Sequence, residues 1–472
     1  MNFQQKIRQQ YAKPGGIQEL LYLALPMIIS TSCDGIMTFT DRLFLARVDS
    51  AQMNASLGGG VTLQVLMFFF VGLIGYSTAL VAQYFGANER RNSAKSSFQA
   101  MLVALAAWPV ILAFTPFAGG FYKMMGIPAV QVGYQVEYLN ILAWGSIFGL
   151  LRYALGCYFT GIGKTKIVMQ ATLLAMVVNV VLDYILIFGK LGFPAMEIRG
   201  AAIATITGSF CAVCVLFVAY FRKENRQEFH ISQSFRFDWK IMKKLLYYGY
   251  PAGVEMFLNF MAFSAMISLF HAKGEVVATA STIMFNWDLV SFIPLLGIEI
   301  AVTSLVGRYM GACRPQVAHR AALSAVKIGL IYSSIVLFLF VFIPETLTRV
   351  FAPSVPSQVF EQAVPIATLM VRIAALYVLV EAMVTALVGA LRGAGDTHFT
   401  MIASVTSHWL FVPILYLSLN VFNFSIGLSW FLLVLFFFMF SFVLYLRFRS
   451  GRWKKIRVIN DDIKEMAISE SN

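Results

Sequence analysis

The sequence predicts an all-α polytopic membrane protein in which twelve transmembrane helices form two six-helix lobes related by a pseudo-twofold axis. Three observations lead to this prediction. The composition is too apolar for a soluble domain: 59% of the 472 residues are hydrophobic and 12% are charged, whereas soluble domains typically have about 25% charged residues. Twelve apolar stretches are long enough to cross about 30 Å of hydrocarbon as helices. The second half of the chain also repeats motifs of the first.

The first six apolar stretches predict an N-terminal lobe at residues 17–221, after a short segment at residues 1–16. The first stretch is longer than the apolar region of a secretory signal and lacks an Ala-x-Ala cleavage pattern, so we expect a retained helix. The predicted spans are residues 17–46, 53–85, 97–121, 131–160, 166–189 and 200–221.

A basic connection at residues 222–243 separates these spans from six more, which form the predicted C-terminal lobe at residues 244–446. A tail at residues 447–472 follows. The predicted spans are residues 244–272, 276–309, 321–344, 360–391, 400–419 and 422–446.

An internal repeat relates the two halves. Pro26 recurs as Pro251, and at the same offset Thr78, Tyr84, Gly86 and Ala87 recur as Thr303, Tyr309, Gly311 and Ala312. The segments 161–165 and 393–397 match at a slightly larger offset, which indicates a short insertion late in the second copy. Because six spans return the chain to its starting side, both halves have the same orientation, and we expect a pseudo-twofold axis along the membrane normal.

The distribution of Lys and Arg predicts the orientation in the membrane. Of the 36 Lys and Arg residues, 26 lie in the two terminal segments, the inter-lobe loop and the loops on the same side, six lie in the opposite loops and four lie within spans. The positive-inside rule therefore places both termini in the cytoplasm. We expect the chain to lie in the cell (inner or plasma) membrane.

The charge and composition also exclude several functions. The net charge of +13 is concentrated where anionic lipid headgroups would meet it, so we expect contacts with membrane lipids and no nucleic-acid partner. The five cysteines are dispersed along apolar spans and do not indicate a disulfide framework. We find no metal-spaced histidines, no Gly-x-Ser-x-Gly and no phosphate loop, so we predict neither an enzyme nor a cofactor.

Acidic residues within the first-half spans are the strongest functional signal, because a carboxylate in hydrocarbon is costly and seldom persists without a task or a partner. Asp34 and Asp41 are seven residues apart and share a helix face, as do Asn179 and Asp183, four apart. If these faces meet, their oxygens form a polar pocket that exchanges a proton or holds Na⁺. Alternatively, Asp41 forms an interfacial salt bridge with a neighbouring arginine, Arg42 or Arg47.

The second half contains further acids within its spans. Glu255 and Asn259 lie one helical turn apart, and isolated acids in an aromatic-rich wall would attract a cationic amphipathic substrate. The candidate substrate-binding residues are Glu255, Asn259, Asp288 and Glu299; Glu381 is an additional acid without an assigned role.

Four segments together resemble the multidrug and toxic compound extrusion (MATE) transporters of bacteria. The match covers essentially the whole chain, with the same order, spacing and duplication. The segments are Leu25-Pro26 with Phe39-Thr40-Asp41-Arg42-Leu43-Phe44, Asn179-Val180-Val181-Leu182-Asp183-Tyr184, Gly200-Ala201-Ala202-Ile203-Ala204-Thr205, and Leu391-Arg392-Gly393-Ala394-Gly395-Asp396-Thr397.

The resemblance implies a V-shaped exporter that exchanges H⁺ or Na⁺ for small organic cations such as drugs, dyes or metabolites. It implies a cation site formed by Asp41, Asn179 and Asp183, with Thr205 as a further ligand. The sequence departs from the family pattern at Arg42, which replaces a small polar residue, and at Asn259, where some members have an acid. Asp34, which we include among the candidate coupling residues, has no equivalent in the common pattern.

Three alternatives remain open from the sequence. A flippase for a lipid-linked sugar shares the lobe architecture but usually lines its cavity with clustered cations, and few lie within the spans here. A metabolite exporter of narrow specificity fits the same features. An enzyme embedded in the membrane is the third alternative, but it would need a recognisable catalytic constellation, and the sequence shows none. One chain contains both halves of the transport pathway, so we expect it to function as a monomer.

Overall fold

The computed structural model describes residues 11, 13–352 and 357–459. Twelve of the described helical segments are long and apolar enough to cross a membrane, which confirms the predicted number. The first six spans are α2 (Ile17–Ala46), α3 (Ser50–Gly75) with α4 (Ser77–Gly86), α5 (Arg90–Met124), α6 (Ala129–Gly161), α7 (Thr165–Phe188) and α8 (Glu197–Phe221).

The second six spans follow two short helices, α9 (Lys223–Glu228) and α10 (Ile231–Ser234), in the inter-lobe loop. They are α11 (Trp239–His271), α12 (Glu275–Gly311), α13 (Pro315–Phe342), α15 (Gln358–Ala394), α16 (Thr397–Tyr416) with the π-helical η1 (Leu417–Val421), and α17 (Ile426–Arg449). The remaining short helices are α14 (Pro344–Arg349) and η2 (Arg452–Lys455). No strand occurs among the described residues.

Several helices extend past the apolar stretches that predicted them. Helix α5 begins at Arg90 rather than at residue 97, and α11 begins at Trp239 rather than at residue 244. The side chain of Asp238 accepts a hydrogen bond from the backbone N–H of Ile241 (3.3 Å) and so caps α11. Both helices begin in polar residues that precede the apolar part, and hydropathy follows only the apolar part.

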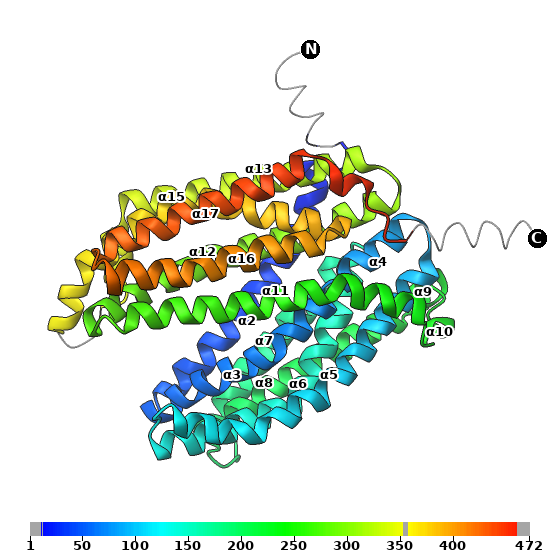
Figure 1. The fold of residues 1–472 in the computed structure, drawn as a ribbon. Coiled ribbons are helices and arrows are strands. Elements are labelled where there is room, and N and C mark those ends of the chain that lie inside the picture. The colour runs from blue at the N-terminus through cyan, green and yellow to red at the C-terminus, as the bar shows by residue number, and fades with distance from the viewer. Residues whose placement is uncertain (1–10, 12, 353–356, 460–472) are drawn as a thin grey trace, which may run out of the picture.

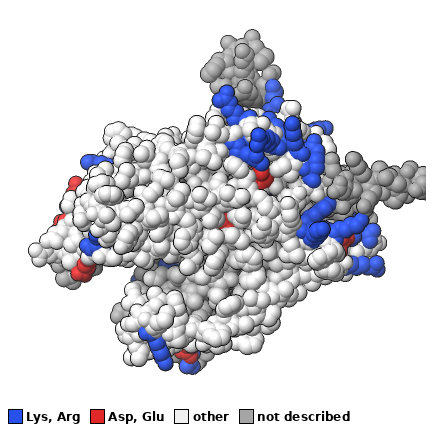
Figure 2. All heavy atoms as spheres, in the orientation of Figure 1, with Lys and Arg blue, Asp and Glu red and all other residues white. Residues whose placement is uncertain are grey.

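The helices form two lobes that lie close together near α4 and diverge toward the opposite end (Figure 1). Helices α3, α5, α6, α7 and α8 belong to the N-terminal lobe, and α12, α13, α15, α16 and α17 to the C-terminal lobe. Figure 2 shows the surface hollowed between the diverging ends of the lobes. The overall shape is therefore a V whose vertex lies near α4.

Helix α2 contacts both lobes. Its first turns place Leu20, Leu23 and Ala24 in the apolar core of the C-terminal lobe, whereas Met37 lies in the main core of the N-terminal lobe and Leu45 in a second cluster of that lobe. It packs on α7 of one lobe and on α12 and α13 of the other. A shift of this helix therefore affects both lobes.

Two glycines related by the internal repeat hold the vertex together. A Cβ atom on Gly86 would overlap the backbone carbonyl of Arg308 in α12, and one on Gly311 would overlap that of Gln83 in α4. Gly311 is the repeat equivalent of Gly86, and Arg308 is the equivalent of Gln83 in the same register. The two contacts are thus pseudo-symmetric, and they bring the helix backbones closer than any side chain would allow.

Polar contacts reinforce the vertex between the lobes. Ser304 Oγ of α12 donates to the backbone carbonyl of Thr160 in α6 (2.6 Å). Gln83 Nε2 of α4 donates to the carbonyl of Gly393 in α15 (2.9 Å). The lobes are therefore held together at one end of the helices by direct backbone packing and buried hydrogen bonds.

Candidate functional site

Four polar side chains from three helices meet inside the N-terminal lobe. Asn179 Nδ2 of α7 donates to Asp41 Oδ1 of α2 (3.2 Å), and Thr205 Oγ1 of α8 donates to Asp41 Oδ2 (3.0 Å). Asp183, one helical turn after Asn179, places its carboxyl group within hydrogen-bonding reach of that of Asp41. The structure thus brings together Asp41, Asn179, Asp183 and Thr205, as the sequence predicted.

This cluster, which we call the Asp41 site, is almost completely shielded from solvent. Asp41 is 6% exposed, and Asn179 and Asp183 are 0% exposed. Both carboxylate oxygens of Asp183 and the amide oxygen of Asn179 lack a hydrogen-bond donor among the described residues. Two buried carboxylates this close cannot both remain charged at low cost unless a proton or cation neutralises them.

The chemistry of the Asp41 site fits a proton or a hard monovalent cation. It offers two carboxylates, an amide oxygen and a hydroxyl, and oxygen ligands of this kind suit hard cations. No group of three or more His, Cys, Asp or Glu side chains arranged to hold a metal occurs in the described part of the chain. The oxygen donors of the site therefore suit a proton or a hard cation such as Na⁺.

The alternative interpretation of Asp41 was a salt bridge with Arg42 or Arg47. No ion pair within 4.0 Å joins Asp41 to either arginine, all three of which are described. Arg42 lies near enough to interact electrostatically with Asp41 and Tyr138. Its charge therefore acts on the Asp41 site from a distance, while Asp41 makes its hydrogen bonds to Asn179 and Thr205.

Asp34 lies outside the Asp41 site. Its Oδ1 atom forms an ion pair with Arg152 Nη1 of α6 at 2.9 Å, and the side chains are 44% and 22% exposed, respectively. The expectation that Asp34 shares a polar pocket with Asp41 is not met, because spacing along α2 carries no information about the arginine that α6 supplies.

The internal repeat does not reproduce the Asp41 site in the C-terminal lobe. At the offset that relates Pro26 to Pro251, Asp41 corresponds to Met266. At the slightly larger offset of the late motifs, Asn179 corresponds to Phe411 and Asp183 to Leu415. Phe411 and Leu415 belong to the apolar core of that lobe, and Met266 packs against it. The positions equivalent to the Asp41 site are therefore apolar in the C-terminal lobe, whose own neighbouring acids, Asp288 and Glu381, lie elsewhere.

Two of the candidate acids in the C-terminal lobe share one arginine. Arg392 of α15 forms ion pairs with Glu255 of α11 (3.1 Å) and with Glu299 of α12 (2.6 Å). Tyr153 of α6, in the other lobe, lies close enough to interact electrostatically with Arg392 and Glu299. Glu255 and Glu299 are therefore not isolated acids, contrary to the expectation from sequence.

The other two candidates make different contacts. Asn259 Nδ2 donates to Ser404 Oγ of α16 (2.8 Å). Asp288 of α12 accepts a hydrogen bond from the hydroxyl group of Tyr377 in α15. Glu381, one turn after Tyr377, is 7% exposed, and its Oε2 atom has no hydrogen-bond donor among the described residues. Asp288, Tyr377 and Glu381 thus form a second polar group between α12 and α15.

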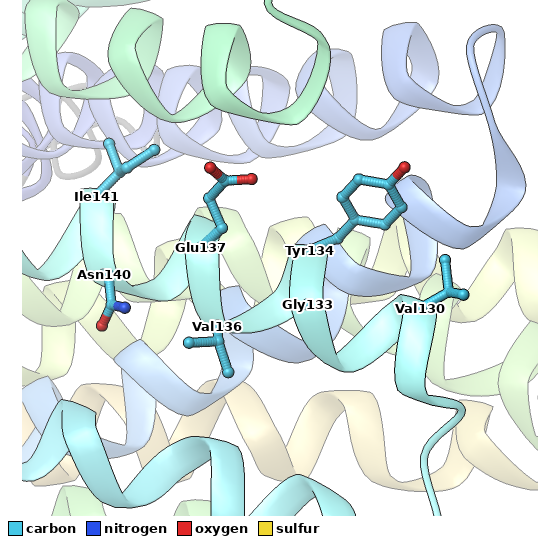
Figure 3. Close-up of a pocket in the computed structure, with 7 residues that line it drawn as sticks. All are labelled: Val130, Gly133, Tyr134, Val136, Glu137, Asn140 and Ile141. Atoms are coloured by element: carbon cyan, nitrogen blue, oxygen red, sulfur yellow. The ribbon is translucent and has the colours of Figure 1, made fainter.

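A surface groove lies along α6, away from these groups. Its volume is about 560 Å³, and it is lined by Val130, Gly133, Tyr134, Val136, Glu137, Asn140 and Ile141. In Figure 3, Tyr134, Glu137 and Ile141 project from one side of α6 and Val136 and Asn140 from the other. Glu137 forms an ion pair with Arg199 of α8. None of the residues of the Asp41 site lines this groove.

Comparisons with known proteins agree on one family. A family model described as MatE matches residues 26–185 and 251–417. The "Probable multidrug resistance protein NorM" of Thermotoga maritima is 28% identical over 463 residues, which cover 95% of this chain and 96% of the relative.

Solved structures share the fold. One described as "Reverse polarity of binding pocket suggests different function of a MOP superfamily transporter from Pyrococcus furiosus" has a TM-score of 0.84 at 19% identity and covers 95% of this chain and 99% of its own. Another, the "Outward-facing conformation of a multidrug resistance MATE family transporter of the MOP superfamily", has a TM-score of 0.83 at 20% identity with the same coverage.

Proposed function

Because the chain belongs to the MATE family of membrane transporters, we propose that it is a secondary active antiporter that exports cationic amphipathic drugs, dyes or metabolites in exchange for H⁺ or Na⁺. The relative described as a multidrug resistance protein supports this substrate class. Membership of a transporter family also agrees with the expectation that the chain is not an enzyme.

The observation that carries the proposal is the buried acid pair of the Asp41 site. Asp41 and Asp183 lie side by side with little or no exposure, and such a pair needs a proton or a cation to remain inside the lobe at low cost. Intramembrane acids without a permanent cationic partner are typical of ion and proton pathways. We therefore assign ion coupling to Asp41, Asn179 and Asp183, with Thr205 supporting Asp41.

In the cycle we propose, ion binding and substrate binding favour different positions of α2. A proton or Na⁺ at the Asp41 site removes the repulsion between the carboxylates and lets α2 pack more closely on α7. Since α2 also packs on α12 and α13, this shift narrows the space between the lobes and expels the substrate. Release of the ion to the cytoplasm follows the return to the inward-facing state.

The charge distribution supports an orientation with both termini in the cytoplasm. Lys and Arg side chains gather at the end of the molecule near α4, α9 and η2 (Figure 2). By the positive-inside rule this end faces the cytoplasm, so the diverging ends of the lobes face outward from the cell (inner or plasma) membrane. One chain supplies both lobes, and we propose that it works as a monomer.

The acids of the cleft have unequal roles in the proposal. Arg392 neutralises much of the charge of Glu255 and Glu299, so these residues attract an organic cation less strongly than isolated acids would. Asp34 is also paired, with Arg152, but its side chain is 44% accessible, compared with 3% for Glu255 and 13% for Glu299. We assign initial attraction of the substrate to Asp34 and closer contacts to Asn259 and Asp288.

Efflux from proteoliposomes tests the function. Ethidium is loaded into the vesicles, and a pH gradient and a Na⁺ gradient are imposed separately. We expect one gradient to drive efflux in the wild-type protein and Asp41→Asn to reduce it to background. Asp49→Asn is the matched control: it removes a carboxylate eight residues away, and asparagine can replace aspartate as the N-terminal cap of α3.

The outcomes separate the remaining hypotheses. Undiminished gradient-driven efflux in Asp41→Asn contradicts the assignment of the ion site. No ethidium flux in correctly inserted wild-type protein under either gradient contradicts multidrug export, and it favours the metabolite exporter of narrow specificity or the flippase. Translocation of a lipid-linked sugar in the same vesicles distinguishes these two.

A further inference from the structure

The segment Gly451–Ile459, at the end of the described chain, connects the two lobes at the vertex of the V. Its first part is anchored in the C-terminal lobe by Trp453, which is 0% exposed. The indole Nε1 donates to the backbone carbonyl of Phe448 (2.9 Å). The indole ring stacks on Phe448 at 5.2 Å and on His319 of α13 at 6.2 Å.

The last residues of the segment pack into the opposite lobe. Val458 and Ile459 are 4% and 3% exposed and belong to the main apolar core of the N-terminal lobe. Ile456, between the two ends, packs against the cores of both lobes. The segment therefore links two bodies that alternating access requires to move apart.

One contact shows how closely the segment follows the junction between the lobes. A Cβ atom on Gly395, at the end of α15, would lie 2.6 Å from Val458 Cγ2 and 3.5 Å from the hydroxyl oxygen of Tyr76. Tyr76 joins α3 to α4 in the N-terminal lobe and stacks on Tyr248 of α11 at 5.7 Å. Val458 thus lies where the two lobes come together.

The apolar side chains of the segment are mostly buried and its basic side chains are mostly exposed. Lys455 and Arg457 are exposed, whereas Trp453, Val458 and Ile459 are buried. Burial of aliphatic side chains is favourable in proportion to the area removed from water. The segment thus has an apolar side that is complementary to the vertex and a basic side that faces solvent or lipid headgroups.

We propose that Gly451–Ile459 is a strap that fastens the two lobes together at the vertex and stabilises the conformation closed at this end. Trp453 holds the strap on the C-terminal lobe, and Val458 and Ile459 are its releasable tip. The proposal rests on the alternating access proposed above, in which this end faces the cytoplasm and opens to take up substrate.

The physical reason is the exposure of the tip on opening. Val458 and Ile459 pack in the N-terminal lobe, and Val458 lies beside Gly395 of the C-terminal lobe. If the lobes separate at the vertex, the two residues lose their contacts with one lobe or the other. Their apolar surface then meets water, which disfavours the open state. Weakening the tip should therefore shift the equilibrium toward the open state without affecting the Asp41 site.

Pulsed EPR distances between two cytoplasmic positions test the strap. Nitroxide labels are placed on cysteines at Arg91 and Gln316, which are exposed and equivalent in the register of the repeat. The full chain is used in lipid nanodiscs. Cys211, Cys214 and Cys313 are replaced by serine, whereas Cys33 and Cys157 are kept because they are buried. Val458→Asp is compared with the matched control Lys455→Asp, which adds the same carboxylate on the exposed side.

We expect Val458→Asp to raise the ratio of long to short distances about tenfold, the effect of losing one well-buried aliphatic contact, and Lys455→Asp to leave it near the wild-type value. If Val458→Asp does not fold, Val458→Ala with Ile459→Ala applies the same test with a smaller perturbation. Distance distributions that match the wild type in the tip variants, or that shift equally in the control, overturn the proposal.

The test is independent of the proposed ion coupling. Loss of ethidium flux in the wild-type protein would contradict the proposed function while the EPR distances still report on the strap. Conversely, a failed strap leaves the gradient-driven flux and its dependence on Asp41 untouched.

Discussion

Arg392 neutralises two acids of the C-terminal lobe at once. Its guanidinium group pairs with both Glu255, whose side chain is 3% exposed, and Glu299, whose side chain is 13% exposed. Removing one partner of a buried charge group leaves the others uncompensated, at a typical cost of about 3–5 kcal/mol. The trio is therefore expected to matter more for stability than for attracting a cationic substrate.

We accordingly predict that Arg392→Gln lowers the thermal unfolding midpoint by several degrees, as measured by intrinsic fluorescence in detergent. The matched control is Arg372→Gln on the same helix, because Arg372 is exposed and no ion pair of its side chain is seen among the described residues. Equal midpoints for Arg392→Gln and wild-type protein would show that the trio contributes little.

Helical spacing predicts which residues share a face, but not which helices meet. Asp41, Asn179 and Asp183 were predicted to meet from helical spacing and family resemblance, and they do. Arg392 was assigned to a loop because the apolar stretch ends at residue 391, whereas α15 continues to Ala394. Its pairing with two other helices is a tertiary contact that spacing along one helix does not encode.

At the scale of elements, the start of α11 depends on the charge of Asp238, just outside the span. Partial burial by itself would raise the pKa of this carboxyl group. Lys95 donates a hydrogen bond to it (2.8 Å) and adds a nearby positive charge, and the backbone N–H of Ile241 donates a second hydrogen bond. Together these interactions outweigh burial and lower the pKa of Asp238. A lowered pKa in the folded state adds stability above the unfolded pKa of about 3.9, and this stability is lost as pH falls through the folded pKa.

We therefore predict that Asp238→Asn destabilises the protein at pH 7 by at most about 1 kcal/mol, since the ion pair is partly exposed. The difference from wild type should shrink as the pH is lowered below about 4. Unfolding midpoints measured across this pH range check the prediction. A difference that stays constant with pH would mean that the charge of Asp238 is not responsible.

The crossing of α4 and α12 supports a prediction about conformational balance. Gly86→Ala or Gly311→Ala places a methyl group against a backbone carbonyl of the other helix, so each should disfavour the conformation closed at the vertex. The EPR distance between positions 91 and 316 should lengthen in both variants. Gly120→Ala is the control, because a Cβ there meets no atom within 4 Å. Unchanged distances in both vertex variants would show that the packing of α4 on α12 does not hold the vertex closed.

At the scale of the whole molecule, composition and the internal repeat predicted the all-helical fold, and the twelve spans are confirmed. Hydropathy and repeated motifs report on membrane crossing and duplication, which are properties of long stretches of sequence. They do not report on which helices pass between lobes, so α2 was assigned entirely to the N-terminal lobe although its first turns pack with the other. The strap was missed because its few apolar residues lie within a basic tail.

The two halves of the repeat share their backbone contacts but differ in their polar residues. The backbone contacts at the vertex obey the register of the repeat, yet the positions equivalent to Asn179 and Asp183 in the other lobe are the apolar Phe411 and Leu415. The fold is thus pseudo-symmetric while the polar chemistry is not. The proposal that ion coupling belongs to the N-terminal lobe rests on this asymmetry.

The most direct measurement is ion release from the purified protein when ethidium binds, recorded in weakly buffered solution for H⁺ and with a Na⁺-selective electrode for Na⁺. Antiport through the Asp41 site predicts release of one of these ions in wild-type protein and in Asp49→Asn, and its loss in Asp41→Asn. Ethidium binding that releases neither ion, or release that persists in Asp41→Asn, would contradict coupling at this site.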